Sequence, residues 1–178
     1  KFMLYTEDVY EIKEYPMFGY LRGRYSCEEL REIDDYAYEL GIEVIPCIQT
    51  LAHMQHYLRW REAASVTDMP DTLLCGSGDT YRLIDKMIST MRQAFRSQRI
   101  NVGLDETFNL GKGQYEKKFG KEDMEIFYRC FRLNGYEEEK KKQKDIAAEY
   151  GLKPTTLNVR LHKIIEFIKK DKTLLDMF

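Results

Sequence analysis

Arg99-Ile100-Asn101-Val102-Gly103-Leu104-Asp105-Glu106 is an apolar run that stops in two adjacent acids. Ile100 and Val102 are β-branched, which favours a short strand buried on both faces. Buried carboxylates are costly unless they are paired, so the strand is expected to deliver Asp105 and Glu106 to a cleft at its C-terminal end. The competing interpretation is a solvated strand end that caps the next helix, and spacing alone favours it because two neighbouring acids are a weak motif.

The composition is that of an ordinary globular protein. With 178 residues and 43% hydrophobic content, the chain can form a real core. No run of the sequence approaches the roughly 18 apolar residues of a membrane span, and no leader pattern opens the chain, so the expected location is cytoplasmic and no membrane partner is expected. Cys27, Cys47, Cys75 and Cys130 form no C-x-x-C pair, which predicts reduced thiols and no metal site.

Upstream of the opening stretch, two further strands and two helices are predicted. A capping box at Ser26-x-x-Glu29 starts the first helix, which ends at Gly41. Apolar residues at helical spacing predict the second helix over about 79–95. The predicted strands are 2–6, 42–48 and 99–104.

This alternation is typical of parallel βαβ units. Each predicted strand is followed by polar residues: Glu7 and Asp8, then Thr50 with His53, then Asp105 and Glu106. The C-terminal ends of parallel strands share one face, so these side chains are expected to converge on one site.

Four motifs in order resemble the catalytic barrel of family 20 glycoside hydrolases, the β-N-acetylhexosaminidases, over about residues 2–120. They are Gly23-Arg24-Tyr25-Ser26, Gly41-Ile42-Glu43-Val44-Ile45-Pro46, Leu51-Ala52-His53 and Val102-Gly103-Leu104-Asp105-Glu106. The resemblance implies retaining, substrate-assisted hydrolysis of a glycan that ends in N-acetylhexosamine, through an oxazolinium intermediate and without a cofactor.

The resemblance also implies roles for single residues. Glu106 would be the general acid, Asp105 would orient the acetamido group, and His53 would stand behind the acid, held by Glu7 or Asp8. A general acid needs a raised pKa, which an apolar site and a second carboxylate both favour. Without the resemblance, a lone histidine such as His53 is more often a hydrogen-bonded structural residue. His53 and the nearby His56 lack a third partner, so no metal site is expected.

The chain departs from the family in its extent. The family barrel has eight strands. Counterparts of the family strand that would precede Phe2, and of the family strands after the fourth, are missing here. The sugar-binding arginine and the later aromatic groups are missing with them. An open piece of barrel exposes strand edges, which predicts pairing with another chain and favours loss of activity.

After Gly120 the sequence changes character. Residues 1–120 have a net charge of −4 (15 basic, 19 acidic), and residues 121–178 have +2 (13 basic, 11 acidic), with +5 over 139–172. An amphipathic helix over Met124–Leu133 is expected to end at Asn134-Gly135, before a charged run over 137–142. A helix over 144–150, a turn at Gly151 and a second helix from Pro154 then predict a helix-turn-helix.

This tail, about 123–170, resembles region four of bacterial sigma factors, which implies duplex DNA and RNA polymerase as partners. The candidate major-groove residues are Thr155, Thr156, Asn158, Val159 and Lys163, and the candidate phosphate contacts are Arg160 and Lys153. Residues 155–161 also resemble a fifth barrel strand, but the helical spacing of Leu157, Leu161, Ile164, Ile165 and Ile168 favours a helix.

The predicted fold class is therefore α/β. A partial (β/α)8 barrel of about three parallel βα units (1–120) precedes a small all-α helix-turn-helix module (121–178). The glycosidase interpretation covers more residues and comes first, and DNA binding by the tail is the alternative.

Overall fold

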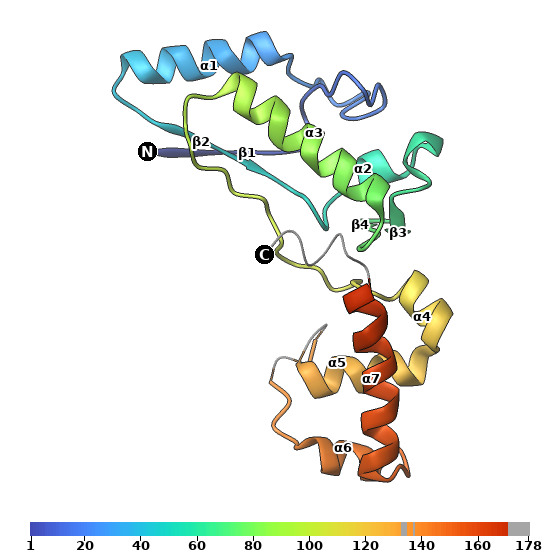
Figure 1. Ribbon diagram of the computed structural model, residues 1–178. Coiled ribbons are helices and arrows are strands. Elements are labelled where there is room, and N and C mark those ends of the chain that lie inside the picture. Colours follow the sequence, from blue (N-terminus) through green and yellow to red (C-terminus); the bar gives the residue numbers. More distant parts are fainter. Residues whose placement is uncertain (133–134, 137, 171–178) are drawn as a thin grey trace. The chain divides into compact units, whose positions relative to one another are not determined.

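A computed structural model describes residues 1–132, 135–136 and 138–170 (Figure 1). The chain forms two compact units, Lys1–Thr107 and Phe108–Phe178. The predicted boundary at Gly120 lies within the second unit. In the described part of the chain, no helix has both the length and the apolar character needed to span a bilayer.

The first unit is built on two parallel strands, β1 (Phe2–Glu7) and β2 (Val44–Ile48), as predicted. They are joined by α1 (Cys27–Glu39), and α3 (Gly78–Ala94) follows β2. Figure 1 shows α1 and α3 together on one side of the two strands, and the core lies between these layers. Residues buried in that core include Leu30 of α1, Val44 and Ile48 of β2, and Leu83, Met87 and Met91 of α3.

The predicted start and end of α1 are confirmed. Ser26 Oγ accepts a hydrogen bond from the Glu29 amide at 3.1 Å, and the Glu29 carboxylate accepts one from the Ser26 amide at 2.8 Å. This reciprocal pair satisfies donors that the first helical turn leaves free. At the other end, Gly41 has a φ of +71°, a conformation that glycine adopts without strain.

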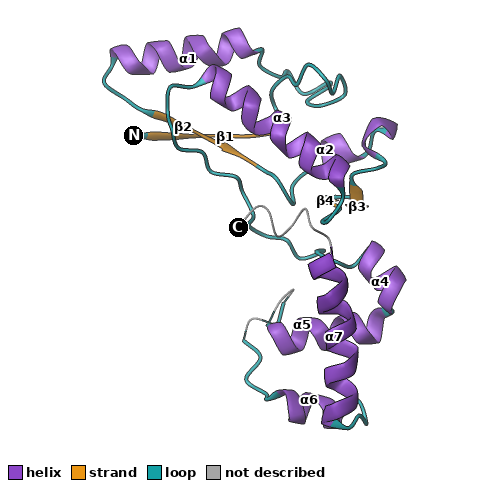
Figure 2. Cartoon of the chain, in the orientation of Figure 1, coloured by secondary structure: helices purple, strands orange, loops and turns teal. Residues whose placement is uncertain are grey.

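The prediction of a strand over 99–104 that is buried on both faces is wrong. Only Asn101 forms a bridge, parallel to Cys47, and the segment is drawn as a loop in Figure 2. The Asn101 amide donates to Pro46 O and its carbonyl accepts from the Ile48 amide, both at 2.9 Å. No described strand pairs with the segment's other edge, so Leu104 remains 59% exposed.

Between β2 and α3 the chain forms short elements. They are α2 (Gln55–Leu58), a 3₁₀ turn η1 (Arg61–Ala63) and an antiparallel pair, β3 (Thr67–Met69) and β4 (Thr72–Leu73). Tyr57 of α2 packs against Phe18 with ring centroids 5.1 Å apart. Both rings are buried and belong to the core of the first unit.

The second unit contains four helices in its described residues: α4 (Gln114–Phe119), α5 (Lys121–Phe131), α6 (Gln143–Glu149) and α7 (Pro154–Lys170). Ile126, Ile146, Ala147, Leu157 and Leu161 form one of its apolar clusters. The alternative of a strand over 155–161 is wrong, because Leu157 and Leu161 are buried from the same face of α7.

The helix predicted over Met124–Leu133 corresponds to α5, which ends at Phe131. Its predicted last residues, Leu133 and Asn134, and the first residue of the charged run, Glu137, lie outside the described residues, as does 171–172 of the basic window. The short helix α4 was not predicted.

Candidate active site

Glu106 and His53, which the sequence predicts to be neighbours, do lie together. His53 Nε2 is 3.4 Å from Glu106 Oε2, so the two form an ion pair when the imidazole is protonated. The Glu106 side chain is 63% exposed and that of His53 is 27% exposed. An acid that is both solvent-accessible and oriented by a neighbour can deliver a proton to a bound molecule.

Three of the predicted site residues have an unusual backbone. The φ angles of Glu7, His53 and Glu106 are +46°, +58° and +52°. Left-handed φ values disfavour side chains with a Cβ and persist only where surrounding contacts enforce them. Glu7 is the last residue of β1, and Glu106 follows the extended segment 99–104, so the chain bends sharply where these segments end.

Asp105 is held by a residue that the sequence analysis missed. Gln49, which follows β2 directly and is 1% exposed, donates from Nε2 to Asp105 Oδ1 at 3.2 Å. The same Nε2 donates to the Tyr5 hydroxyl, also at 3.2 Å. The position of Gln49 beside Thr50, at the predicted converging edge, was the available signal.

Glu7 and Asp8 form ion pairs with Arg22, a second residue that the sequence analysis missed. Arg22 Nη1 lies 2.7 Å from Asp8 Oδ1 and 3.2 Å from Glu7 Oε2. Within the described residues neither acid forms a hydrogen bond or ion pair with His53, although the resemblance implied one. The sequence pattern gave Arg22 no distinguishing spacing, since it lies in the irregular loop before α1.

Asp8 is fully buried, and burial of its charged carboxylate costs free energy. Burial raises the pKa of the Asp8 carboxyl, against the opposing positive charges of Arg22 and His56. Its Oδ2 atom has no hydrogen-bond partner among the described residues. Asp8 is therefore a buried acid with one oxygen bound to Arg22 and the other unpaired.

Tyr5 connects the Gln49–Asp105 pair to the ion pairs of Glu7 and Asp8 with Arg22. Its hydroxyl accepts from Gln49 and donates to Glu7 Oε1 at 3.2 Å. Partial burial, opposed by the hydrogen bond from Gln49, raises the pKa of Tyr5. The phenol therefore keeps its proton at neutral pH and can serve as the donor to Glu7.

Gly103 allows the two segments that carry Gln49 and Asp105 to approach closely. Its φ is +56°, and a Cβ there would overlap the Ile48 carbonyl oxygen and lie 2.5 Å from Gln49 Oε1. The Thr50 hydroxyl donates to Val102 O at 2.8 Å in the same contact. Only glycine fits this position without displacing its neighbours.

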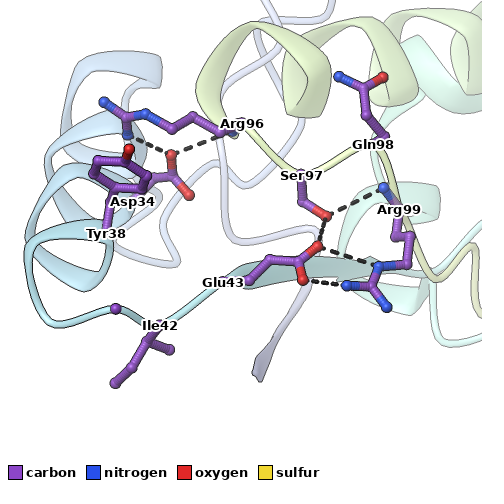
Figure 3. A pocket seen from close by; sticks show the side chains of 9 residues that line it. Asp34, Tyr38, Ile42, Glu43, Arg96, Ser97, Gln98 and Arg99 are labelled. Atoms are coloured by element: carbon purple, nitrogen blue, oxygen red, sulfur yellow. Dashed lines mark hydrogen bonds and ion pairs between the residues drawn. The ribbon is translucent and has the colours of Figure 1, made fainter.

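A cavity of about 450 Å³ lies at the other end of the sheet (Figure 3). Arg96 lines it, pairing with Asp34 Oδ2 at 2.7 Å and with Asp35 Oδ1 at 2.5 Å, and Arg99 pairs with Glu43. Glu43 directly precedes β2, and Arg99 precedes the bridge at Asn101, so the cavity is at the N-terminal ends of these segments. Because both arginines are already paired, the arrangement fits a stabilising role.

The candidate DNA-binding residues lie on or next to α7 in the second unit. Lys153, Thr155, Thr156, Asn158, Val159 and Lys163 are exposed. Arg160, in contrast, binds Glu122 Oε1 at 2.6 Å and Asp123 Oδ1 at 2.8 Å, on α5. A phosphate would have to compete with two carboxylates for its guanidinium.

Comparison with curated proteins identifies relatives of one kind. Hexosaminidase D from Bos taurus is 30% identical over 114 residues, covering 59% of this chain and 33% of its own length. Hexosaminidase D from Homo sapiens is 30% identical over 99 residues, covering 53% of this chain and 20% of its own length. The chain thus spans a third or less of these relatives.

Comparison with solved structures gives the same fold. The β-N-acetylhexosaminidase from Bacteroides fragilis NCTC 9343 matches with a TM-score of 0.52 at 20% identity, over 84% of this chain and 34% of that protein. An inactive mutant of the GH20 exo-β-N-acetylglucosaminidase from Vibrio harveyi matches with a TM-score of 0.53 at 13% identity, over 90% and 29%. The α/β class is thereby confirmed, and the partial barrel stays a prediction.

The family comparison covers most of the chain. Residues 10–151 match the catalytic domain of glycosyl hydrolase family 20, a range that includes α6. None of the relatives named above is a sigma factor, so DNA and RNA polymerase as partners stay predictions without support. On the extent of this match, the chain belongs to glycosyl hydrolase family 20.

Proposed function

We propose that the site around Glu106 hydrolyses terminal N-acetylhexosamine residues from glycans by a retaining, substrate-assisted mechanism. The observation that carries the proposal is the placement of Glu106 beside His53, with Asp105 next to it and fixed by Gln49. One carboxyl group is thus solvent-accessible, and its neighbour is held in a defined orientation.

In the first step Glu106 gives its proton to the glycosidic oxygen as the bond to the anomeric carbon breaks. The acetamido oxygen of the substrate attacks that carbon from the opposite face, and Asp105 stabilises the positive charge that develops on the acetamido nitrogen. The product is a cyclic oxazolinium ion, and no bond forms to the protein.

In the second step water attacks the anomeric carbon, and the bond between that carbon and the acetamido oxygen breaks, which restores the acetamido group. Glu106 takes a proton from the attacking water, as microscopic reversibility requires. The carbon is inverted twice, so its configuration is retained. His53 lies within 3.4 Å of Glu106 and orients its carboxyl group for both proton transfers.

The test is hydrolysis of 4-nitrophenyl N-acetyl-β-glucosaminide by the full chain. Glu106→Gln keeps the shape and removes the proton, so kcat should fall by about 10²- to 10⁴-fold. Glu32→Gln, on the exposed surface of α1, is the matched control and should leave kcat unchanged. The corresponding glucoside, which lacks the acetamido group, should not be cleaved.

Three results would each overturn the proposal. They are no hydrolysis by the wild-type chain, equal rates for wild type and Glu106→Gln, and equal cleavage of the glucoside.

A further inference from the structure

Gln49 is a buried amide placed between the Asp105 carboxylate and the Tyr5 hydroxyl. Its side chain is 1% exposed, and a buried amide needs hydrogen-bond partners because it loses its contacts with water. Both partners are on the nitrogen: Nε2 lies 3.2 Å from Asp105 Oδ1 and 3.2 Å from the Tyr5 hydroxyl.

The acceptors fix the orientation of this amide. Turning it over would place Oε1 against the Asp105 carboxylate, where two acceptors would repel each other. In the observed orientation Oε1 is buried and has no partner within the described part of the chain. An unsatisfied acceptor costs free energy, so the donor contacts of Nε2 must outweigh that cost.

The Tyr5 hydroxyl, one of the two acceptors of Gln49 Nε2, is itself connected to the end of β1. Tyr5 donates to Glu7 Oε1, and Glu7 Oε2 accepts from Arg22 Nη1 and Nη2 at 3.2 and 3.3 Å. Arg22, Glu7, Tyr5, Gln49 and Asp105 therefore form one continuous set of hydrogen bonds. Asp105 is exposed, yet its side chain is tied through Gln49 to groups on the neighbouring strand.

We infer that Gln49 is a positioning residue that holds the Asp105 carboxylate toward the acetamido group of the substrate; the catalytic part of this inference rests on the proposed function. A hydrogen bond from an uncharged donor to a carboxylate is among the stronger ones, so its loss should lower kcat by about 10- to 100-fold. KM should change little, because Gln49 is only 1% exposed and is therefore shielded from a bound molecule.

A double-mutant cycle tests whether Gln49 acts through Asp105. Gln49→Leu should lower kcat, and Gln49→Leu combined with Asp105→Asn should be no slower than Asp105→Asn alone. Additive losses would overturn the inference. Gln98→Leu, at an exposed glutamine that precedes the segment 99–104, is the matched control and should retain full kcat.

Gln49→Glu separates positioning from a merely structural role. At neutral pH the new carboxylate repels Asp105, and at acid pH its protonated form again donates a hydrogen bond. The optimum of kcat should therefore move to lower pH in this variant, while circular dichroism shows the wild-type fold. An unchanged pH profile would contradict the inference.

A measurement without substrate keeps the two proposals apart. The side-chain amide protons of Gln49, identified in the nitrogen-15 spectrum by their absence in Gln49→Leu, should shift when wild type is acidified. Asp105→Asn should abolish that shift. If the coupling is seen but the chain hydrolyses nothing, only the proposed function fails; if acidification leaves the Gln49 signals of wild type in place, or Asp105→Asn leaves the shift intact, Gln49 does not hold Asp105.

Discussion

The backbone at Glu7, His53 and Glu106 shows how single residues shape the site. Each has a φ between +46° and +58°, a region that costs residues with a Cβ of order 1–3 kcal/mol. Such strain is tolerated where other contacts fix the chain, and Glu7 and Glu106 both have ionic partners. At both residues the unusual backbone therefore coincides with an ionic contact of the side chain.

At this scale Asp8→Asn tests the cost of a buried charge. Burial raises the pKa of Asp8 above the ordinary value of about 3.9, so the folded chain binds this proton more tightly than the unfolded chain. The contribution of Asp8 to stability is greatest below the unfolded pKa and falls as the pH rises through the folded pKa. An asparagine does not titrate, so the variant does not lose this contribution as the pH rises. From about pH 4 upward, the unfolding free energy of Asp8→Asn should therefore increase relative to that of wild type.

Urea denaturation of both proteins across this pH range measures the difference. Asp85→Asn, which removes the same charge at an exposed position on α3, is the matched control. A difference between Asp8→Asn and wild type that moves in favour of wild type with rising pH would contradict the assignment.

The sequence predicted the acid pair and the histidine but not their supports. Asp105, Glu106 and His53 could be named because they follow predicted strands and match family motifs. Gln49 and Arg22 could not, because their partners are 56 and 14 or 15 residues away and the pairing depends on how loops fold back. Short-range patterns carry no information about such contacts.

Among the elements, those with local signals were predicted well. The first helix has a capping box and a terminal glycine, and the spacing of apolar residues defined α3 within about a residue at each end. The segment 99–104 has equally strong β-branched residues, yet it forms a single bridge with β2. Strand formation depends on packing and on hydrogen bonds with a neighbouring strand, which a residue pattern does not report.

Gly103→Ala tests how this segment is held against β2. Two costs apply, the positive φ and the overlap of the new Cβ with Ile48 O. Gly23→Ala is the matched control, since Gly23 has a φ of +63° and open space around it. Gly23→Ala should cost about 1 kcal/mol, and Gly103→Ala about 1–3 kcal/mol more because of overpacking.

Denaturant midpoints of the two variants measure the difference. Equal losses in Gly103→Ala and Gly23→Ala would mean that the close approach at Ile48 does not contribute.

At the scale of the whole molecule, the boundary between the two units is set by contacts rather than by composition. The sequence pattern changes at Gly120, whereas the structure divides after Thr107. Residues before Gly120 belong to the second unit because the Tyr128 hydroxyl donates to Leu110 O at 2.9 Å and Gly111 lies against the same side chain. The helix α4 has no side-chain cap and no buried residues, so the sequence carries no local signal for it before Gly120.

The exposed apolar side chains of the first unit predict self-association. Phe2 and Met3 of β1 and Leu104 are 53%, 51% and 59% exposed, and no described strand covers the outer edge of β1. Unpaired edges and apolar surface favour pairing between chains. Sedimentation equilibrium should therefore show an average mass that rises with concentration.

Met3→Lys and Leu104→Lys should reduce this rise. Val159→Lys, at a residue 57% exposed on α7, should leave it unchanged. A monomer at every concentration in the wild-type protein would contradict the prediction.

The ion pairs of Arg96 and Arg99 stand at the end of the sheet opposite to Glu106, and this separation has an evolutionary consequence. Arg96 ties α1 to the segment after α3, and Arg99 ties that segment to Glu43 before β2, so these contacts are separate from those of Glu106 and His53. Loops around the acids can therefore be exchanged, by natural drift or by grafting, while the opposite end keeps the scaffold intact. A library randomised only in the exposed loops around Glu106 and His53 should retain a high proportion of folded members.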